Sequence, residues 1–193
     1  MPNYCRNTLV VKGEYENVKS FLQEIEFVKD HENGERFSII ATLFPCPETL
    51  TDTISGTSRG AEHEAQMASN IEIYGHPTWY EWAIANWGTK WGDFDTQIER
   101  SSVYYEIKDD KVVFPYDNED KQDNNEYIRF HFDTAWSPPI KAFERISKMY
   151  PTLTFILRYT ESGMEFKGEA TFTNGAVTDN RLPYVPEWDD DYS

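Results

Sequence analysis

The sequence predicts a layered α+β domain in which helices pack on one face of a mostly antiparallel sheet. Segments with alternating apolar residues recur between segments with helical spacing. Their order is strand, helix, strand, then helix, strands, helix, strands, which is typical of this class. Aromatic residues make up 16% of the 193 residues, and each large ring can bury roughly 150 to 250 Å². We therefore expect one domain over residues 1–186 with a well-filled core, followed by an acidic tail over 187–193.

The first part of the chain predicts a strand, a helix and a second strand. Alternation from Cys5 to Val11 indicates the first strand. Apolar residues at i, i+3, i+4, i+7 and i+10 predict a helix over 15–28; these residues are Val18, Phe21, Leu22, Ile25 and Val28. Asn33-Gly34 is a turn signal, and the apolar run 37–43 suits a buried strand.

A weaker stretch follows and leads into a second helix. Residues 48–60 are rich in Thr, Ser and Gly and are expected to form a surface loop, with a short helix beyond it. Thr78 and Glu81 have the spacing of a capping box, and Gly88 has the place of a left-handed helix end. A helix over 78–87 is the consequence.

The second half predicts strands around a third helix. Residues 102–115 read as a hairpin, and 127–134 alternate as a half-buried strand. Ser137 as N-cap and Pro138 at the first position start a helix, whose apolar face is Ile140, Phe143, Ile146 and Met149. Further strands are expected over 153–159 and 164–172.

Charge favours basic partners. The chain has 34 Asp and Glu against 18 Lys and Arg, a formal net charge of -16, so it repels phosphate backbones and anionic lipid. The same charge could simply keep the protein soluble. Segments 117–126 and 187–193 are the expected acidic clusters. Their candidate contact residues are Asp117, Glu119, Asp120, Asp123, Glu126, Asp189, Asp190 and Asp191.

Two aromatic segments, 86–91 and 132–139, join indoles to residues that end or start helices. Trp87, Trp91 and Trp136, with Lys90 between the first two, are the other contact candidates. Tryptophans at element ends either pack beneath the corner loops or lie exposed in a recognition patch. The sequence leaves both alternatives open.

Four blocks in order carry a family resemblance: residues 2–7, 86–91 and 132–139, and Glu161-Ser162-Gly163 with its following residues Phe166 and Gly168. They resemble the YubB ferredoxin-like family of phages and conjugative plasmids. Tyr4 and Gly92 depart from the family pattern, in which Trp and Asp tend to stand there; here Asp93 follows one residue later. The resemblance implies a ferredoxin-like sandwich of mobile-element origin and supplies no established activity.

Enzyme chemistry would depend on polar residues near the aromatic segments. His131 and Asp133 project from one strand face, as an acid/base or metal pair would. Their spacing is also common on solvated strands. Cys5 and Cys46 lie too far apart for a zinc knuckle, and neither a phosphate-binding loop nor a nucleophile elbow is found. We expect no catalysis, no cofactor and no metal.

The leading functional hypothesis is a non-catalytic acidic inhibitor in the cytoplasm of a bacterial host. Its partner would be a basic, nucleic-acid-handling protein of bacterial defence, and no membrane contact is expected. A second hypothesis is a single-stranded nucleic-acid-binding module that stacks bases on sheet or corner aromatics. It ranks lower because Arg129 and Arg158 are the main cations expected on the sheet, so direct nucleic-acid binding is not expected. A metal-dependent enzyme is the third hypothesis.

Overall fold

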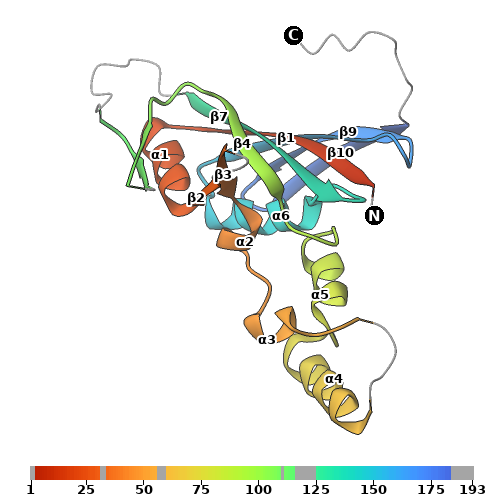
Figure 1. Ribbon diagram of the computed structural model, residues 1–193. Coiled ribbons are helices and arrows are strands. Elements are labelled where there is room, and N and C mark those ends of the chain that lie inside the picture. The colour runs from red at the N-terminus through yellow and green to blue at the C-terminus, as the bar shows by residue number, and fades with distance from the viewer. Residues whose placement is uncertain (1–2, 31–33, 56–59, 110, 116–124, 184–193) are drawn as a thin grey trace.

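An eight-stranded antiparallel sheet forms the body of the protein (Figure 1). The computed structural model describes residues 3–30, 34–55, 60–109, 111–115 and 125–183. The strand order is β10-β9-β8-β1-β7-β4-β3-β2. The strands are β1 (Tyr4–Gly13), β2 (Glu26–Asp30), β3 (Gly34–Ser38), β4 (Phe94–Ser101), β7 (Glu126–Ala135), β8 (Thr154–Glu161), β9 (Phe166–Thr173) and β10 (Ala176–Pro183). A separate hairpin joins β5 (Glu106–Lys108) and β6 (Lys111–Val113).

The helices of the body lie on one side of this sheet (Figure 1). The six helices among the described residues are α1 (Tyr15–Glu24), α2 (Ile40–Leu43), α3 (Glu48–Thr51), α4 (Ala61–Tyr74), α5 (Trp79–Asn86) and α6 (Ile140–Met149). The predicted α+β class, with helices on one face of a mostly antiparallel sheet, is therefore confirmed. In the described part of the chain, no helix is long and apolar enough to cross a membrane.

Aromatic rings fill the space between the sheet and the helices α1 and α6. Phe21 of α1 meets Phe130 and Phe155 edge to face, with centroids 6.3 and 5.6 Å away. Phe143 of α6 contacts Phe155 and Phe172 at 6.2 and 6.0 Å. All five rings are fully buried. Such pairs contribute about 0.5–1.5 kcal/mol each beyond their burial, so this cluster dominates the core.

The first helix is shorter than its apolar spacing predicts. It ends at Glu24, and Ile25 is already extended, with φ -78° and ψ 139°. Val28 lies in β2, so its assignment to the helix was wrong. Pairing of β2 with β3 places the ring centroids of Phe27 and Phe37 5.3 Å apart. The chain makes this strand contact here instead of a further turn of the helix. Asn33 of the expected turn lies outside the described residues.

The predicted strand over 37–43 divides into the end of β3 and the helix α2. The half-buried Asp93 fixes this change of direction, because its carboxylate accepts hydrogen bonds from the amides of Ile39 and Ile40 at 2.9 and 2.6 Å. The hydroxyl of Thr96 donates a third hydrogen bond to this carboxylate at 2.6 Å. Burial raises the pKa of Asp93 while these hydrogen bonds lower it, and the net direction is upward. Asp93 thus has a structural task.

The third predicted helix starts later than its N-cap signal indicates. Helix α6 begins at Ile140 with Pro139 as N-cap. Ser137 instead donates to the carbonyl of Gly88 at 2.6 Å. Met149 is 50% exposed, so the apolar face ends before it. The helix over 78–87 is confirmed as α5, and Gly88 has the expected left-handed φ of 83°.

Residues 45–55 and 60–86 form an arm that projects from the helix side of the body (Figure 1). It holds α3, α4 and α5, and α4 runs to Tyr74, well beyond the short helix expected here. Asn70 is the only buried residue of α4. Its amide donates to the carbonyl of Pro77 at 2.9 Å and its oxygen accepts from Gln66 at 2.9 Å. The Trp79 amide donates to Thr53 at 3.0 Å, which ties the start of α5 to the segment after α3.

Candidate functional site

The two aromatic segments of the sequence meet and form one corner. Thr89 donates to the carbonyl of Ala135 at 2.7 Å. The amide of Ala142 donates to the carbonyl of Trp87 at 3.3 Å. Together with the bond from Ser137 to Gly88, these contacts hold the end of α5, the end of β7 and the start of α6 in one arrangement. This corner joins the arm to the body.

The three candidate tryptophans have different environments. Trp87 is buried, donates from Nε1 to the carbonyl of Phe44 at 2.9 Å, and packs edge to face on Trp82 at 5.4 Å. Trp87 therefore belongs to the core and is not an exposed contact residue. Trp91 is 37% exposed and Trp136 is half-buried. The two alternatives left open by the sequence therefore apply to different residues.

Lys90 lies among aromatic rings. Its Nζ is 4.9 Å from the ring centroid of Trp91, 5.0 Å from that of Trp136 and 5.9 Å from that of Tyr80. Each contact is within reach of a cation–π attraction. Trp136 has a φ of 70°, a left-handed value that is unusual for a bulky residue. The corner thus holds an indole beside Lys90 at a cost in backbone strain.

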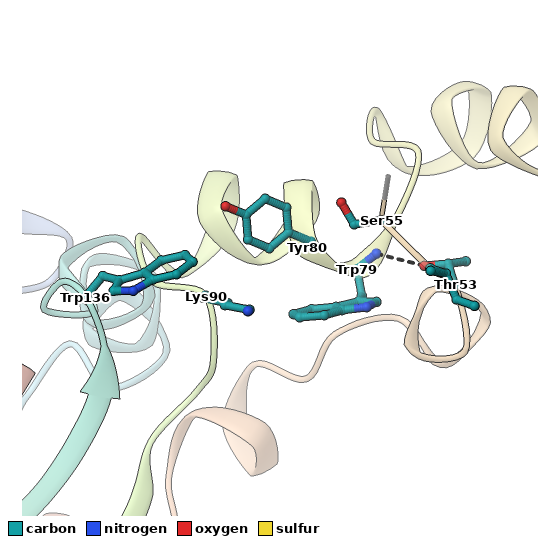
Figure 2. A pocket seen from close by; sticks show the side chains of 7 residues that line it. Thr53, Ser55, Trp79, Tyr80, Lys90 and Trp136 are labelled. Atoms are coloured by element: carbon teal, nitrogen blue, oxygen red, sulfur yellow. Dashed lines mark hydrogen bonds between the residues drawn. The ribbon is translucent and has the colours of Figure 1, made fainter. Parts of the chain in front are cut away.

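A groove of about 480 Å³ opens beside Lys90, where the arm joins the body. Figure 2 shows Trp136 at one end and Thr53 at the other, with Lys90 and Trp79 between them and Tyr80 next to Trp79 on α5. Its lining consists of Thr53, Ile54, Ser55, Trp79, Tyr80, Lys90 and Trp136. This volume is within the range of sites that hold small ligands or single side chains. Rings, hydroxyls and one ammonium suit an apolar group with a polar end.

The sequence of the arm is acidic. Residues 45–86 contain six carboxylates and one basic residue, Arg59, which lies outside the described residues. The carboxylates are Glu48, Asp52, Glu62, Glu64, Glu72 and Glu81. Large apolar side chains lie exposed among them: Ile71 is 51% exposed and Ile73 66%. The arm therefore presents an acidic surface that includes apolar positions.

The side of the sheet away from the helices has the opposite charge balance; we call it the open face. Arg6 of β1 lies opposite Asp133 of β7 and Thr160 of β8, and Lys167 of β9 lies opposite Thr160. Residues directly opposite in register share a face. Following the strand pairings in register, and taking every second residue along each strand, places six cations on the open face: Arg6, Lys12, Arg100, Arg129, Arg158 and Lys167. The sequence expectation of Arg129 and Arg158 as its main cations missed four of them.

His131 and Asp133 share the open face, as predicted, but His131 pairs elsewhere. Its Nε2 lies 3.0 Å from Glu99 Oε2, and its Nδ1 lies 3.0 Å from the hydroxyl of Thr8. Burial raises the pKa of Asp133, against the lowering effect of nearby Arg6. Exposed fractions of 53% and 40% for the His131 and Glu99 side chains leave this contact in solvent. Among the described residues, no group of three or more His, Cys, Asp or Glu could hold a metal ion.

The acidic candidates chosen from the sequence lie mostly beyond the described residues. These are Asp117, Glu119, Asp120, Asp123, Asp189, Asp190 and Asp191. Glu126 begins β7 and is buried, so it does not contribute to an acidic surface. The arm carboxylates went unnoticed, although counting charges segment by segment would have found them. The thiols do not offer a nucleophile, because burial raises the pKa of Cys5 to about 12 and that of Cys46 to about 11.

A family model agrees with the architecture. Residues 115–191 match the family model described as a ferredoxin-like domain in Api92-like protein. Among solved structures, the chain is similar to a crystal structure of a protein api92 from Yersinia pseudotuberculosis, with 10% identity over 97% of this chain and 99% of that one and a TM-score of 0.47. No curated protein matches the chain. The family model and the sheet topology together show that this is a ferredoxin-like α+β protein, similar over residues 115–191 to the domain found in Api92-like proteins.

Proposed function

We propose that this chain is a non-catalytic binding protein that inhibits a basic host protein of a bacterial defence system through its acidic arm. The observation that supports this proposal is the charge of the arm, which has six carboxylates against a single Arg or Lys, Arg59, over residues 45–86. The proposed phage or plasmid origin rests only on the resemblance of the four sequence blocks to the YubB family; the comparisons with known proteins do not name that family and support a ferredoxin-like domain similar to that in Api92-like proteins. A host protein that handles nucleic acid would carry the complementary basic surface.

The charge density of the arm is below that of a nucleic-acid strand. Helix α4 has 14 residues, so it is about 21 Å long at about 1.5 Å per residue. A strand with one charge per roughly 3.4 Å would carry about six charges over that length, and a duplex about twelve. Helix α4 carries three carboxylates, those of Glu62, Glu64 and Glu72. Occupation of a channel for a single strand is therefore a better fit than imitation of duplex DNA.

Charge alone does not give tight binding, because exposed ion pairs contribute only about 0–1 kcal/mol each. Binding energy in protein interfaces concentrates in a few apolar anchors surrounded by polar groups. The groove between Trp79 and Trp136 can accept such an anchor from the partner, and the exposed Ile71 and Ile73 can add contacts on α4. We therefore expect the partner to present Lys or Arg around an apolar side chain.

The test compares two variants of equal net charge. The arm variant carries Glu62→Lys, Glu64→Lys and Glu72→Lys, and the body variant carries Glu14→Lys, Glu16→Lys and Glu144→Lys, after circular dichroism has shown that both are folded. Each protein is used to capture partners from bacterial lysate, and the captured protein is then purified and its affinity and activity are measured. We expect the arm variant to bind at least tenfold more weakly and to lose inhibition, while the body variant keeps both.

Equal losses in the two variants would mean that only the net charge matters, and the proposed role of the arm would be abandoned. Raised salt should weaken the wild-type contact, because an acid-to-base interface is screened at high ionic strength. The captured partner could also bind with full affinity and still keep its full activity. In that case the arm would be a docking surface, and the proposed inhibition would be rejected.

A further inference from the structure

We propose that the open face of the sheet is a second and independent binding site, which takes single-stranded nucleic acid. Two observations support the site: an excess of cations on this face of an otherwise acidic protein, and a cluster of partly exposed rings at one end of the same face. Neither is part of the arm, and neither is used by the proposed function.

The cations are distributed across five neighbouring strands. Lys167 lies on β9, Arg158 on β8, Arg6 and Lys12 on β1, and Arg129 on β7, with Arg100 opposite it on β4. The carboxylates on this face are Glu99, Asp133 and Glu169, and exposed Asp95 lies near enough to raise the pKa of Asp133, so six cations face at most four anions. Two of the cations are paired: Arg158 contacts Glu169 at 2.6 Å and Arg129 contacts Glu99 at 3.6 Å. The excess remains positive although the whole chain has a net charge of -16.

An aromatic platform continues this face at the end near the corner. Tyr4 and Phe94 share the face, because Tyr4 precedes Arg6 by two residues and Phe94 lies opposite Asp133. The ring of Phe94 is 5.2 Å from that of Tyr4 and 6.2 Å from that of Trp91. Tyr4 is 48% exposed and Trp91 37%. Stacking on one such ring strengthens binding roughly 5- to 150-fold per base, and it needs bases that are not paired.

The dimensions suit a short single strand. Five strands spaced about 4.8 Å apart span roughly 19 Å from β9 to β4. On the order of six phosphates fit along that distance at about 3.4 Å each, and six cations lie there. The arm, which contains six carboxylates, projects from the opposite, helix side of the body (Figure 1). The acidic surplus and the cationic face are therefore separated in space.

The test measures fluorescence anisotropy of a labelled twelve-nucleotide oligo(dT) at 50 mM salt, with wild type and matched variants of the full chain. We expect micromolar binding that weakens steeply with salt. Trp91→Ala should weaken it at least fivefold, and Trp91→Phe should restore most of it because a ring is again present. Arg6→Ala with Lys12→Ala should weaken binding and reduce its salt dependence, whereas Lys111→Ala with Lys141→Ala, an equal change of charge away from this face, should not.

Several results would overturn the site. These are no binding by wild type at 50 mM salt, equal weakening by the two pairs of charge variants, or binding that is insensitive to Trp91→Ala. Preference for a duplex of the same length would also reject it, since stacking requires unpaired bases. The arm variant with three Glu→Lys substitutions separates this site from the proposed function. It should still bind the oligonucleotide, but it should no longer bind the host protein.

Discussion

The sandwich and the arm of this protein are built by different means. The sandwich buries rings such as Phe21, Phe143 and Phe155 completely between its sheet and two helices. In the arm, the 14-residue α4 buries only Asn70 and leaves Ile73 66% exposed. Stability therefore resides mainly in the sandwich. In the arm, α3 and α5 contribute the buried Leu50 and Trp82, whereas α4 depends on local hydrogen bonds. Charge follows the same division, with cations on the open face of the sheet and an excess of carboxylates on the arm.

The largest effect is expected from the core of the sandwich. Phe143→Ala removes a ring that contacts Phe132, Phe155 and Phe172, and it should lower the free energy of unfolding by about 3–5 kcal/mol. Denaturant unfolding followed by circular dichroism measures the change. Met164→Ala, at a site that is 60% exposed, is the matched control. A loss below about 1 kcal/mol for Phe143→Ala would contradict a core organised around this ring.

A smaller effect, confined to the arm, is expected from Asn70→Ala. The variant removes the hydrogen bonds with Pro77 and Gln66 and should destabilise the arm by about 1–3 kcal/mol. Hydrogen exchange should show faster exchange of α4 amides while β1 and β8 keep their protection. Uniform loss of protection would show that the arm and the sandwich unfold as one unit.

Acid is expected to loosen the arm through Glu81. Burial raises the pKa of this carboxyl, but hydrogen bonds from Thr78, its own amide and Ser55 outweigh burial and bring the pKa below its ordinary value of 4.5. Because the unfolded state takes up the proton more readily, this contribution to stability is present above pH 4.5 and is lost as pH falls through the lower, folded pKa. The protection factors of α5 amides, which correct for the slower intrinsic exchange in acid, should therefore fall with acid in the wild type. Glu81→Gln should flatten this dependence, whereas Glu62→Gln should retain it.

The smallest effect is expected from Ile73→Ala, which should change the free energy of unfolding by less than about 0.5 kcal/mol because the side chain lies mostly in solvent. The same denaturant experiment measures it. A loss above about 1 kcal/mol would show that this isoleucine is covered in solution, for example by a second copy of the chain, and a concentration series would then reveal the association.

Periodicity predicted most of the sandwich, and it failed where one pattern fits two structures. The strands around Leu9, Phe130 and Leu157 alternate cleanly and were predicted. The apolar run 37–43 fits both a strand and a buried helix, and a hydrogen-bond partner more than 50 residues away, Asp93, decides for helix α2 at its end. Local sequence cannot contain that information.

The candidate site was predicted less well, because it depends on strand order. Lys90, Trp91 and Trp136 were chosen as contact residues, and the structure brings their side chains together. Arg6 and Lys167 belong to one cationic face only because β1 lies between β7 and β8, with β9 beyond β8. His131 contacts Glu99 because β4 has an irregular register there. Pairings across a sheet cannot be read from spacing along one strand.

The left-handed backbone at Trp136 has a consequence for protein engineering. Glycine would adopt this conformation without the cost of about 1–2 kcal/mol that a side chain brings. A library selected for heat resistance alone should therefore drift toward glycine or asparagine at this position. The selected variants would have a higher melting temperature but would lack the indole ring beside Lys90. A substitution at this one position should therefore raise thermostability while it weakens binding.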